Sequence, residues 1–216
     1  MKNRFCFFSA ILMVALMSFG GRAKTQEGVP TNFSISLVTV SHGQGPVYLK
    51  QVANDKGVFF EMRCDSMRAY DNDFNPFFEV YHDIDIVDFT AGKVYNLKPE
   101  TKTGKVENFD VAKADMYKGF NRTIRVFLFA HNFHKENLEA TGKEKIIGRD
   151  VTVYTDTAAV SYDTDRKFWI DDQYGFALKS VEIHGENNTT MYVTEFIVGG
   201  ATVEGLVNLG EYKLEK

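Results

Sequence analysis

The sequence predicts a mainly β protein: one curved antiparallel sheet with a mostly apolar helical insertion from the middle of the chain. Three observations predict this fold. From residue 33 onward, short runs of alternating apolar and polar residues follow one another with turn residues between them. The segment 121–136 is instead apolar at helical spacing. The 19 Phe and 10 Tyr residues supply ring surface that can line a cavity as well as fill a core.

The first 23 residues have the features of a secretory signal peptide. Lys2 and Arg4 precede an apolar run over 5–19, and the small residues Gly21 and Ala23 end the segment. This run is short for a membrane span, which needs about 20 residues, so an uncleaved anchor is the less favoured alternative. The expected organisation is a signal peptide (1–23), a flexible N-terminal segment (24–32) and one β-rich domain (33–216).

Cysteine content and charge narrow the class of protein. No cysteine near Ala23 could accept a lipid, and Cys64 is the only cysteine left after cleavage, so no intramolecular disulfide can form. Cleavage removes three of the 25 Lys and Arg residues and none of the 29 acids, which leaves 22 basic against 29 acidic side chains. This balance argues against nucleic acid as a partner. We expect a monomer that does not span the membrane, in the periplasm, with secretion as the second choice.

Strands are predicted along both halves of the domain. Gly45 and Gly57 are expected to give hairpin turns their backbone freedom. In the first half the runs are FSISLVTVS (33–41), PVYLKQVA (46–53), VFFEMRC (58–64), FFEVYHDIDIVDF (77–89), KVYNL (93–97) and KVENF (105–109). In the second half they are GKEKIIG (142–148), RDVTVYT (149–155), AAVSYD (158–163), RKFWID (166–171), FALKSVEIH (176–184), TTMYVTEFIVG (189–199) and GLVNL (205–209).

The strand predicted over 189–199 is apolar on both faces. Strict alternation places Tyr192, Phe196 and Val198 on one face, and Met191, Val193 and Ile197 on the other. A half-exposed antiparallel sheet would keep one face polar. The strand therefore indicates a sheet curled around a helix or an apolar cavity.

Helices are predicted over 110–117 and 121–136. The second is apolar around much of its circumference, which is typical of a helix buried on more than one side. Its apolar residues include Ile124, Phe127 and Leu128, and Phe120 lies just before it.

Two patterns raise the question of a metal. His131 and His134 lie three residues apart with Glu136 nearby, but no further His/Cys cluster completes a zinc site. A metal-dependent enzyme using these two histidines is the weakest alternative function.

Asp71, Asp73 and Asn75 resemble half of a calcium loop, but Pro76 stands where that loop needs glycine and His82 where it needs glutamate. We therefore expect a solvated loop and no metal, although these residues leave calcium open.

The carboxylate pairs are interpreted as structural. Asp83 and Asp85 would share the solvent face of a strand. Asp171 and Asp172 fall in a hairpin turn, where we expect them to stay solvated with ordinary acidity, and Trp169 becomes a candidate wall residue.

No nucleophile elbow or phosphate-binding glycine loop is present in the sequence. The sequence thus predicts a protein that is not an enzyme and needs no cofactor.

Two stretches carry a resemblance to a known family: GKEKIIGRDVTVYTDTAAVSYDTDRKFWIDDQYGFALKSVEI (142–183) and IVDFTAGKVYNLKPETKTGKV (86–106). Over about residues 33–210 the chain resembles the LolA/LolB superfamily of periplasmic lipoprotein carriers. The resemblance implies an unclosed barrel whose cavity holds acyl chains under a helical lid. It also makes Arg63 a loose candidate for the strand arginine that holds the lid in that family.

The predicted function is that of an exported binding protein for a lipid, an acylated lipoprotein or another hydrophobic ligand, with a role in lipoprotein or lipid trafficking. The alternative is an envelope protein–protein interaction module with a filled core. The residues expected to line the ligand site are Trp169, Phe120, Ile124, Phe127, Leu128, Tyr192 and Phe196.

Overall fold

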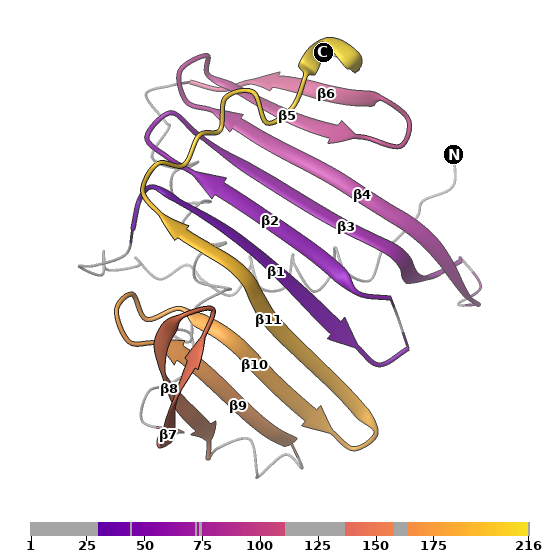
Figure 1. Ribbon diagram of the computed structural model, residues 1–216. Coiled ribbons are helices and arrows are strands. Elements are labelled where there is room, and N and C mark those ends of the chain that lie inside the picture. The colour runs from indigo at the N-terminus through magenta and orange to yellow at the C-terminus, as the bar shows by residue number, and fades with distance from the viewer. Residues whose placement is uncertain are drawn as a thin grey trace.

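The described residues of the protein form a twelve-stranded sheet (Figure 1). The computed structural model describes residues 30–43, 45–71, 73, 75–110, 137–157 and 164–215. The strands are β1 (Phe33–Ser41), β2 (Val47–Ala53), β3 (Gly57–Tyr70), β4 (Pro76–Asp88), β5 (Lys93–Lys98), β6 (Thr103–Asn108), β7 (Leu138–Ile146), β8 (Arg149–Asp156), β9 (Thr164–Asp171), β10 (Ala177–His184), β11 (Asn187–Val198) and β12 (Lys213–Glu215).

Two meanders make up the sheet. Its strand order is β12-β6-β5-β4-β3-β2-β1-β11-β10-β9-β8-β7, so β1–β6 and β7–β11 each pair in sequence order and join where β1 meets β11. All pairs are antiparallel except the parallel pair of β12 with β6. The sheet curves without closing (Figure 1). The predicted fold class of one curved, unclosed antiparallel sheet is confirmed.

Several predicted elements lie outside the described residues. They are the strand over 158–163 and, apart from Asp110, the helices over 110–117 and 121–136, together with the cavity that these helices would cover. Within the described part of the chain, no helix is long and apolar enough to cross a membrane.

The strand predicted over 205–209 is wrong. Gly205 has a positive φ of 78° and lies in a turn, and a short 3-10 helix (η5, Leu209–Glu211) precedes β12. The C-terminal segment packs instead over one end of the first meander, seen in yellow in Figure 1. Val203, Val207, Leu209, Tyr212 and Leu214 cover the buried cluster of Val52, Phe59, Ile84, Tyr95 and Leu97.

The turn glycines have a different role from the predicted one. Neither Gly45 nor Gly57 has a positive φ. A Cβ on Gly57 would lie 2.5 Å from the backbone oxygen of Val87, and one on Gly45 would lie 3.1 Å from Ser66 Cβ. Both positions need glycine because a neighbouring strand approaches closely.

A β-bulge divides β11. Ser36 lies opposite Glu195, whereas Leu37 lies opposite Val193, so Thr194 is an extra residue on β11. The extra residue reverses the alternation of the side chains on its two sides. Phe196 therefore shares a face with Val193, and Tyr192 lies on the other face, so the predicted common face of Tyr192 and Phe196 is wrong.

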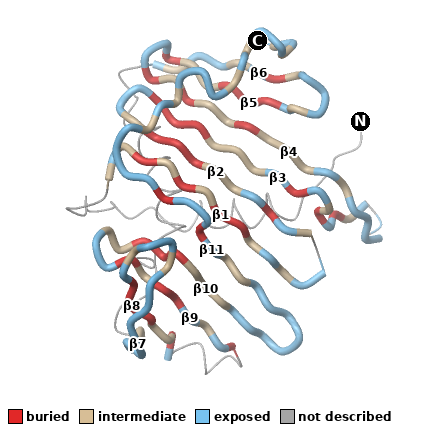
Figure 2. The backbone as a smooth tube through the Cα atoms, viewed as in Figure 1, coloured by how far each residue is buried: buried red, intermediate tan, exposed pale blue. Residues whose placement is uncertain are grey.

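The largest apolar cluster spans both meanders. Buried positions alternate with less buried ones along the strands (Figure 2). The cluster unites residues of β1, β2, β3, β4, β8, β9, β10 and β11, and of the segments that follow β4 and β9: Phe33, Ile35, Leu37, Ala53, Val58, Val87, Phe89, Val151, Val153, Trp169, Phe176, Leu178, Val193 and Phe196.

Candidate functional site

The hairpin between β9 and β10 is built on a buried carboxylate. The Asp171 side chain is 1% exposed and forms an ion pair with Arg149, whose Nε lies 2.5 Å from Oδ2. Its Oδ1 accepts hydrogen bonds from the backbone N–H groups of Gln173 (3.0 Å) and Tyr174 (2.7 Å). Gly175, with a φ of 70°, closes the turn by donating to the Asp171 carbonyl. The predicted hairpin is present, but the expectation of a solvated Asp171 is wrong.

Asp172 points away from this centre and is partly exposed. Its carboxylate accepts hydrogen bonds from Lys143 Nζ (2.6 Å) and Thr152 Oγ1 (2.5 Å). These two contacts, Lys143 first, lower the pKa of Asp172 below the usual aspartate value. Both turn carboxylates are therefore engaged with donors from β7 and β8, which suits a structural role.

Arg149 also organises a group of aromatic rings. Its guanidinium carbon lies 5.0 Å from the ring centroid of Tyr174 and 5.1 Å from that of Phe196. Phe176 contacts Phe196 edge to face at 4.7 Å, and Phe33 at 6.4 Å. We call Phe33, Tyr174, Phe176 and Phe196 the aromatic cluster. Sequence reasoning missed Arg149, because its partners Asp171 and Phe196 are far along the chain and only the fold brings them together.

Trp169 is the most unusual polar group of this region. Its side chain is 9% exposed and belongs to the same apolar cluster as Phe33, Phe176 and Phe196. The Lys179 ammonium lies 4.2 Å from the ring centroid. Among the described residues, the indole Nε1–H has no hydrogen-bond acceptor. Buried donors are nearly always satisfied, so this one calls for an explanation.

The structure brings together two of the predicted lining residues. Trp169 and Phe196 lie in one apolar cluster, whereas Tyr192 is 40% exposed on the other side of β11. The remaining four, Phe120, Ile124, Phe127 and Leu128, lie outside the described residues.

Arg63, the candidate for holding a lid, is exposed on β3. Its Nε forms an ion pair with Asp65 Oδ1 at 2.9 Å. The lid that it would hold is outside the described residues, as are His131 and His134.

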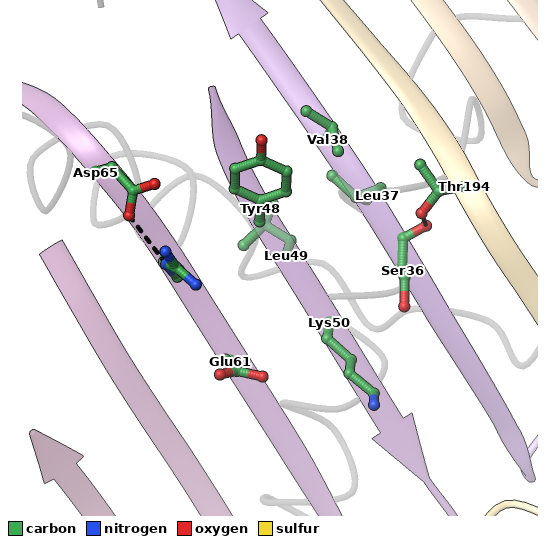
Figure 3. Close-up of a pocket in the computed structure, with 10 residues that line it drawn as sticks. Ser36, Leu37, Val38, Tyr48, Leu49, Lys50, Glu61, Asp65 and Thr194 are labelled. Atoms are coloured by element: carbon green, nitrogen blue, oxygen red, sulfur yellow. Dashed lines mark hydrogen bonds and ion pairs between the residues drawn. The ribbon is translucent and has the colours of Figure 1, made fainter. Parts of the chain in front are cut away.

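A second candidate site is an open pocket of about 420 Å³ over β1, β2 and β3 (Figure 3). Cross-strand pairing places Tyr48 between Val38 of β1 and Arg63 of β3. The described residues that line the pocket are Ser36, Leu37, Val38, Tyr48, Leu49, Lys50, Glu61, Arg63, Asp65 and Thr194.

The aspartates of β4 differ from the predicted solvent pair. Asp83 and Asp85 share a face, as expected, and Asp83 forms an ion pair with Lys98. Burial is the main cause that raises the pKa of Asp85 above the usual value, although Asn96 donates a hydrogen bond to it (2.7 Å). Asp85 is thus not an ordinary solvated carboxylate.

The carboxylate of Asp71 accepts hydrogen bonds from within its own loop. Asp71 Oδ1 accepts hydrogen bonds from the backbone N–H groups of Asp73 and Asn75, each at 2.9 Å. Within the described ranges, no three His, Cys, Asp or Glu side chains are placed to hold a metal ion.

Comparison with solved structures finds several chains that match over most of the length of this chain. MucB of Pseudomonas aeruginosa, solved in complex with MucA, is 14% identical, with 84% of this chain and 57% of that one covered and a TM-score of 0.43. The lipoprotein LppX of Mycobacterium tuberculosis is 13% identical, with 93% and 96% covered and a TM-score of 0.37. A LolA superfamily protein of Nitrosomonas europaea is 3% identical, with 80% and 87% covered and a TM-score of 0.25.

The solved structures found by this comparison include a member of the LolA superfamily, the family that the sequence resembles. This chain spans little more than half the length of MucB. No protein-family model matches the sequence, and no curated protein is similar to it at the threshold of the comparison.

Proposed function

We propose that the chain is an exported, non-catalytic binding protein that holds a lipid, an acyl chain or another apolar ligand beside the aromatic cluster. Trp169 carries the proposal, because a buried indole N–H without an acceptor among the described residues lies within an apolar cluster. Small-molecule sites combine an apolar lining with a few placed polar groups. A ligand oxygen would give this N–H the acceptor that it lacks.

The surroundings of Trp169 favour a ligand with one polar end. The Lys179 ammonium lies against the indole ring, so a carboxylate or ester oxygen near Nε1 would also meet a positive charge. The hydrocarbon part would pack on the rings of Phe176 and Phe196. The proposal assigns Asp171 and Asp172 to holding the hairpin and not to acid–base chemistry, because both already accept hydrogen bonds from nearby donors.

The same proposal places the protein in the periplasm, with a signal peptide at 1–23 and a binding domain that begins near Phe33. Its partners would be a lipid or an acylated lipoprotein, and its role would lie in moving such molecules between membranes.

The chain contains one tryptophan, so Trp169 itself reports binding. Protein purified from the compartment in which it accumulates would be examined by native mass spectrometry for a retained lipid. Delipidated protein would then be titrated with palmitate while the Trp169 emission is recorded. We expect a retained lipid and a saturable change in emission.

Two variants make the test specific. Trp169→Phe keeps an aromatic ring but removes the N–H, and its palmitate affinity, measured by calorimetry, should fall about fivefold, the value of one hydrogen bond. Tyr192→Phe is the matched control, because Tyr192 lies outside the cluster, and it should bind as the unaltered protein does. Protein that is empty as purified and shows no saturable palmitate binding would overturn the proposal.

A further inference from the structure

The first half of β4 lies at an edge of the sheet. β4 spans Pro76–Asp88, but β5 pairs only with its residues Ile84–Asp88. Among the described residues, the segment Pro76–Asp83 has a neighbouring strand on one side only, which is β3. In Figure 1 this part of β4 extends beyond the end of β5. We call the segment Pro76–Asp83 the β4 edge.

The backbone groups of Phe78 and Val80 point to the outer side of this edge. The Asn75 carbonyl accepts a hydrogen bond from the loop that follows β3 (3.1 Å), and the Phe89 N–H donates one to the turn that precedes β3 (2.8 Å). Successive residues of a strand direct their N–H and C=O groups to opposite sides. The odd-numbered residues of β4 therefore face β3. Phe78 and Val80 face the side on which the described part of the chain provides no strand.

The side chains of the same two residues are apolar and exposed. Phe78 is 60% exposed and Val80 is 57% exposed, the two highest values among the large apolar residues that the structure describes as exposed. Phe77, which points to the other face of the strand, is 36% exposed. The β4 edge thus combines outward backbone groups with apolar surface on both faces, which is typical of a strand that pairs with another one.

The outermost strands of the sheet are protected against such pairing. β7 exposes the charged run 143–145 and carries a bulge at Thr141, and the opposite end of the sheet is β12, only three residues long. Charges, bulges and short edge strands all hinder pairing. The β4 edge has Pro76 at its start but no lysine, and its partner β3 carries the local bulge. It is the least protected edge of the described sheet.

The chemistry of the β4 edge selects an extended, uncharged strand as its occupant. A lipid has no row of N–H and C=O groups to pair with those of Phe78 and Val80, whereas an added strand has. Between Pro76 and Tyr81 the edge offers one charge, that of Glu79, so a strand rich in charge would lose solvation without finding opposite charges. The same edge of a second copy meets both conditions. Its outward groups alternate in the same phase, so antiparallel pairing sets each N–H opposite a C=O.

We propose that the β4 edge pairs with the β4 edge of a second copy, antiparallel and about a two-fold axis near Glu79. The two sheets then join into one, and the contact is the same patch on both copies. Phe78 and Val80 of one copy lie across from the same two residues of the other. The dimer goes beyond both the binding of an apolar ligand and the monomer that the sequence led us to expect. It uses none of the residues around Trp169, so each proposal can fail without the other.

Sedimentation velocity of the full exported chain, over about 1 to 300 µM, measures the association. We expect a reversible dimer with a Kd on the order of 10–100 µM, because the edge is short and buries little area. Val80→Pro removes an outward N–H and leaves the ladder with β3 intact, so it should weaken the dimer about tenfold or more. Val80→Lys adds the residue that commonly protects edges and should act in the same direction.

Ile183→Lys is the matched control. Ile183 is a β-branched residue that is 42% exposed, but it lies on β10 between paired residues of β9 and β11. Its replacement should leave the dimer unchanged. Circular dichroism and the emission of Trp169 check that each variant is folded.

Cysteine cross-linking distinguishes a second copy from a different partner. A residue on the two-fold axis of an antiparallel pair meets itself, at a distance that a disulfide can bridge. One of the variants Phe78→Cys, Glu79→Cys and Val80→Cys should therefore form a covalent dimer on mild oxidation. Ile183→Cys should not, and the native Cys64 is buried and does not compete.

Three results would overturn the proposal. The first is a chain that stays monomeric at about 300 µM. The second is a dimer that Val80→Pro and Val80→Lys leave unchanged, which would place the contact elsewhere. The third is a loss of binding to phosphatidylcholine vesicles in Val80→Lys without a covalent dimer in any of the three cysteine variants, which would assign the exposed side chains to a lipid surface.

Discussion

Breaking the ion pair between Arg149 and Asp171, beneath the β9–β10 hairpin, should lower the free energy of unfolding considerably. In Arg149→Met the carboxylate of Asp171, 1% exposed, keeps its two backbone donors but loses its cation. Removing one partner of a buried pair costs about 3–5 kcal/mol, since the other charge stays buried. Arg149 is 22% exposed, so water can reach the vacated place, and we expect the lower end of this range, about 3 kcal/mol.

Urea unfolding followed by Trp169 emission measures this change. With a slope of about 2–3 kcal/mol per molar urea, the midpoint should fall by roughly 1–1.5 M. A double-mutant cycle with Asp171→Asn should show a coupling energy of about 1–3 kcal/mol. Lys145→Met is the control, because the pair of Lys145 with Asp150 is exposed on both sides and should be worth at most about 0.5 kcal/mol. A loss below about 1 kcal/mol with no coupling would mean that Asp171 is effectively solvated.

Three further changes test other contacts, each by urea unfolding. Gly57→Ala should cost about 1–3 kcal/mol, because its Cβ would meet the Val87 carbonyl at 2.5 Å, and a neutral effect would contradict the close approach. Asp172→Asn should cost about 0.5 kcal/mol of stability at pH 7. Because the pKa of Asp172 is lowered in the folded protein, this contribution is present above about pH 4 and is lost in acid. A difference between the two proteins that stays constant down to pH 2 would refute this prediction. The raised pKa of Asp85 has the opposite effect on stability, because the fold becomes less stable as the pH rises and this buried carboxyl group ionises. Asp85→Asn should therefore gain stability at pH 7, on the order of 1 kcal/mol, and should show no gain near pH 4.

The positions of most strands followed from the sequence because they depend on local patterns. Alternation with a period of two and turn residues at short intervals locate a strand without knowledge of its neighbours. The prediction over 205–209 failed for the same reason: Leu206 and Val207 resemble a strand, but Gly205 turns the chain and Val207 packs over the first meander instead.

The candidate site could be predicted only where it is local. The hairpin at Asp171 was recognised, but adjacent and identical side chains at 171 and 172 received different surroundings. Asp171 is buried because Arg149, on β8, reaches it, and Asp172 is partly exposed because it faces Lys143 on β7. The pocket around Lys50 has no signal in the sequence, since it arises from the register of β1, β2 and β3.

The bulge at Thr194 is the feature that an alternation pattern is least able to predict, and its effect can be measured. Strict alternation over the full sequence would place Phe196 on the face of Tyr192, away from Phe176, and the bulge prevents this. Deleting Thr194 removes the bulge and leaves Val193, Glu195 and Phe196 in regular alternation opposite Leu37, Ser36 and Ile35. Phe196 should therefore stay buried, and the deletion should cost only about 1 kcal/mol, the value of the hydrogen bond lost with the residue. Thr194→Ala keeps the bulge and loses only the hydroxyl, which donates to the Ser36 carbonyl at 3.2 Å, so it should cost about 1 kcal/mol or less. A loss of about 3 kcal/mol or more on deletion, as truncating a buried phenylalanine causes, would mean that Phe196 leaves the aromatic cluster and that this account of the register is wrong.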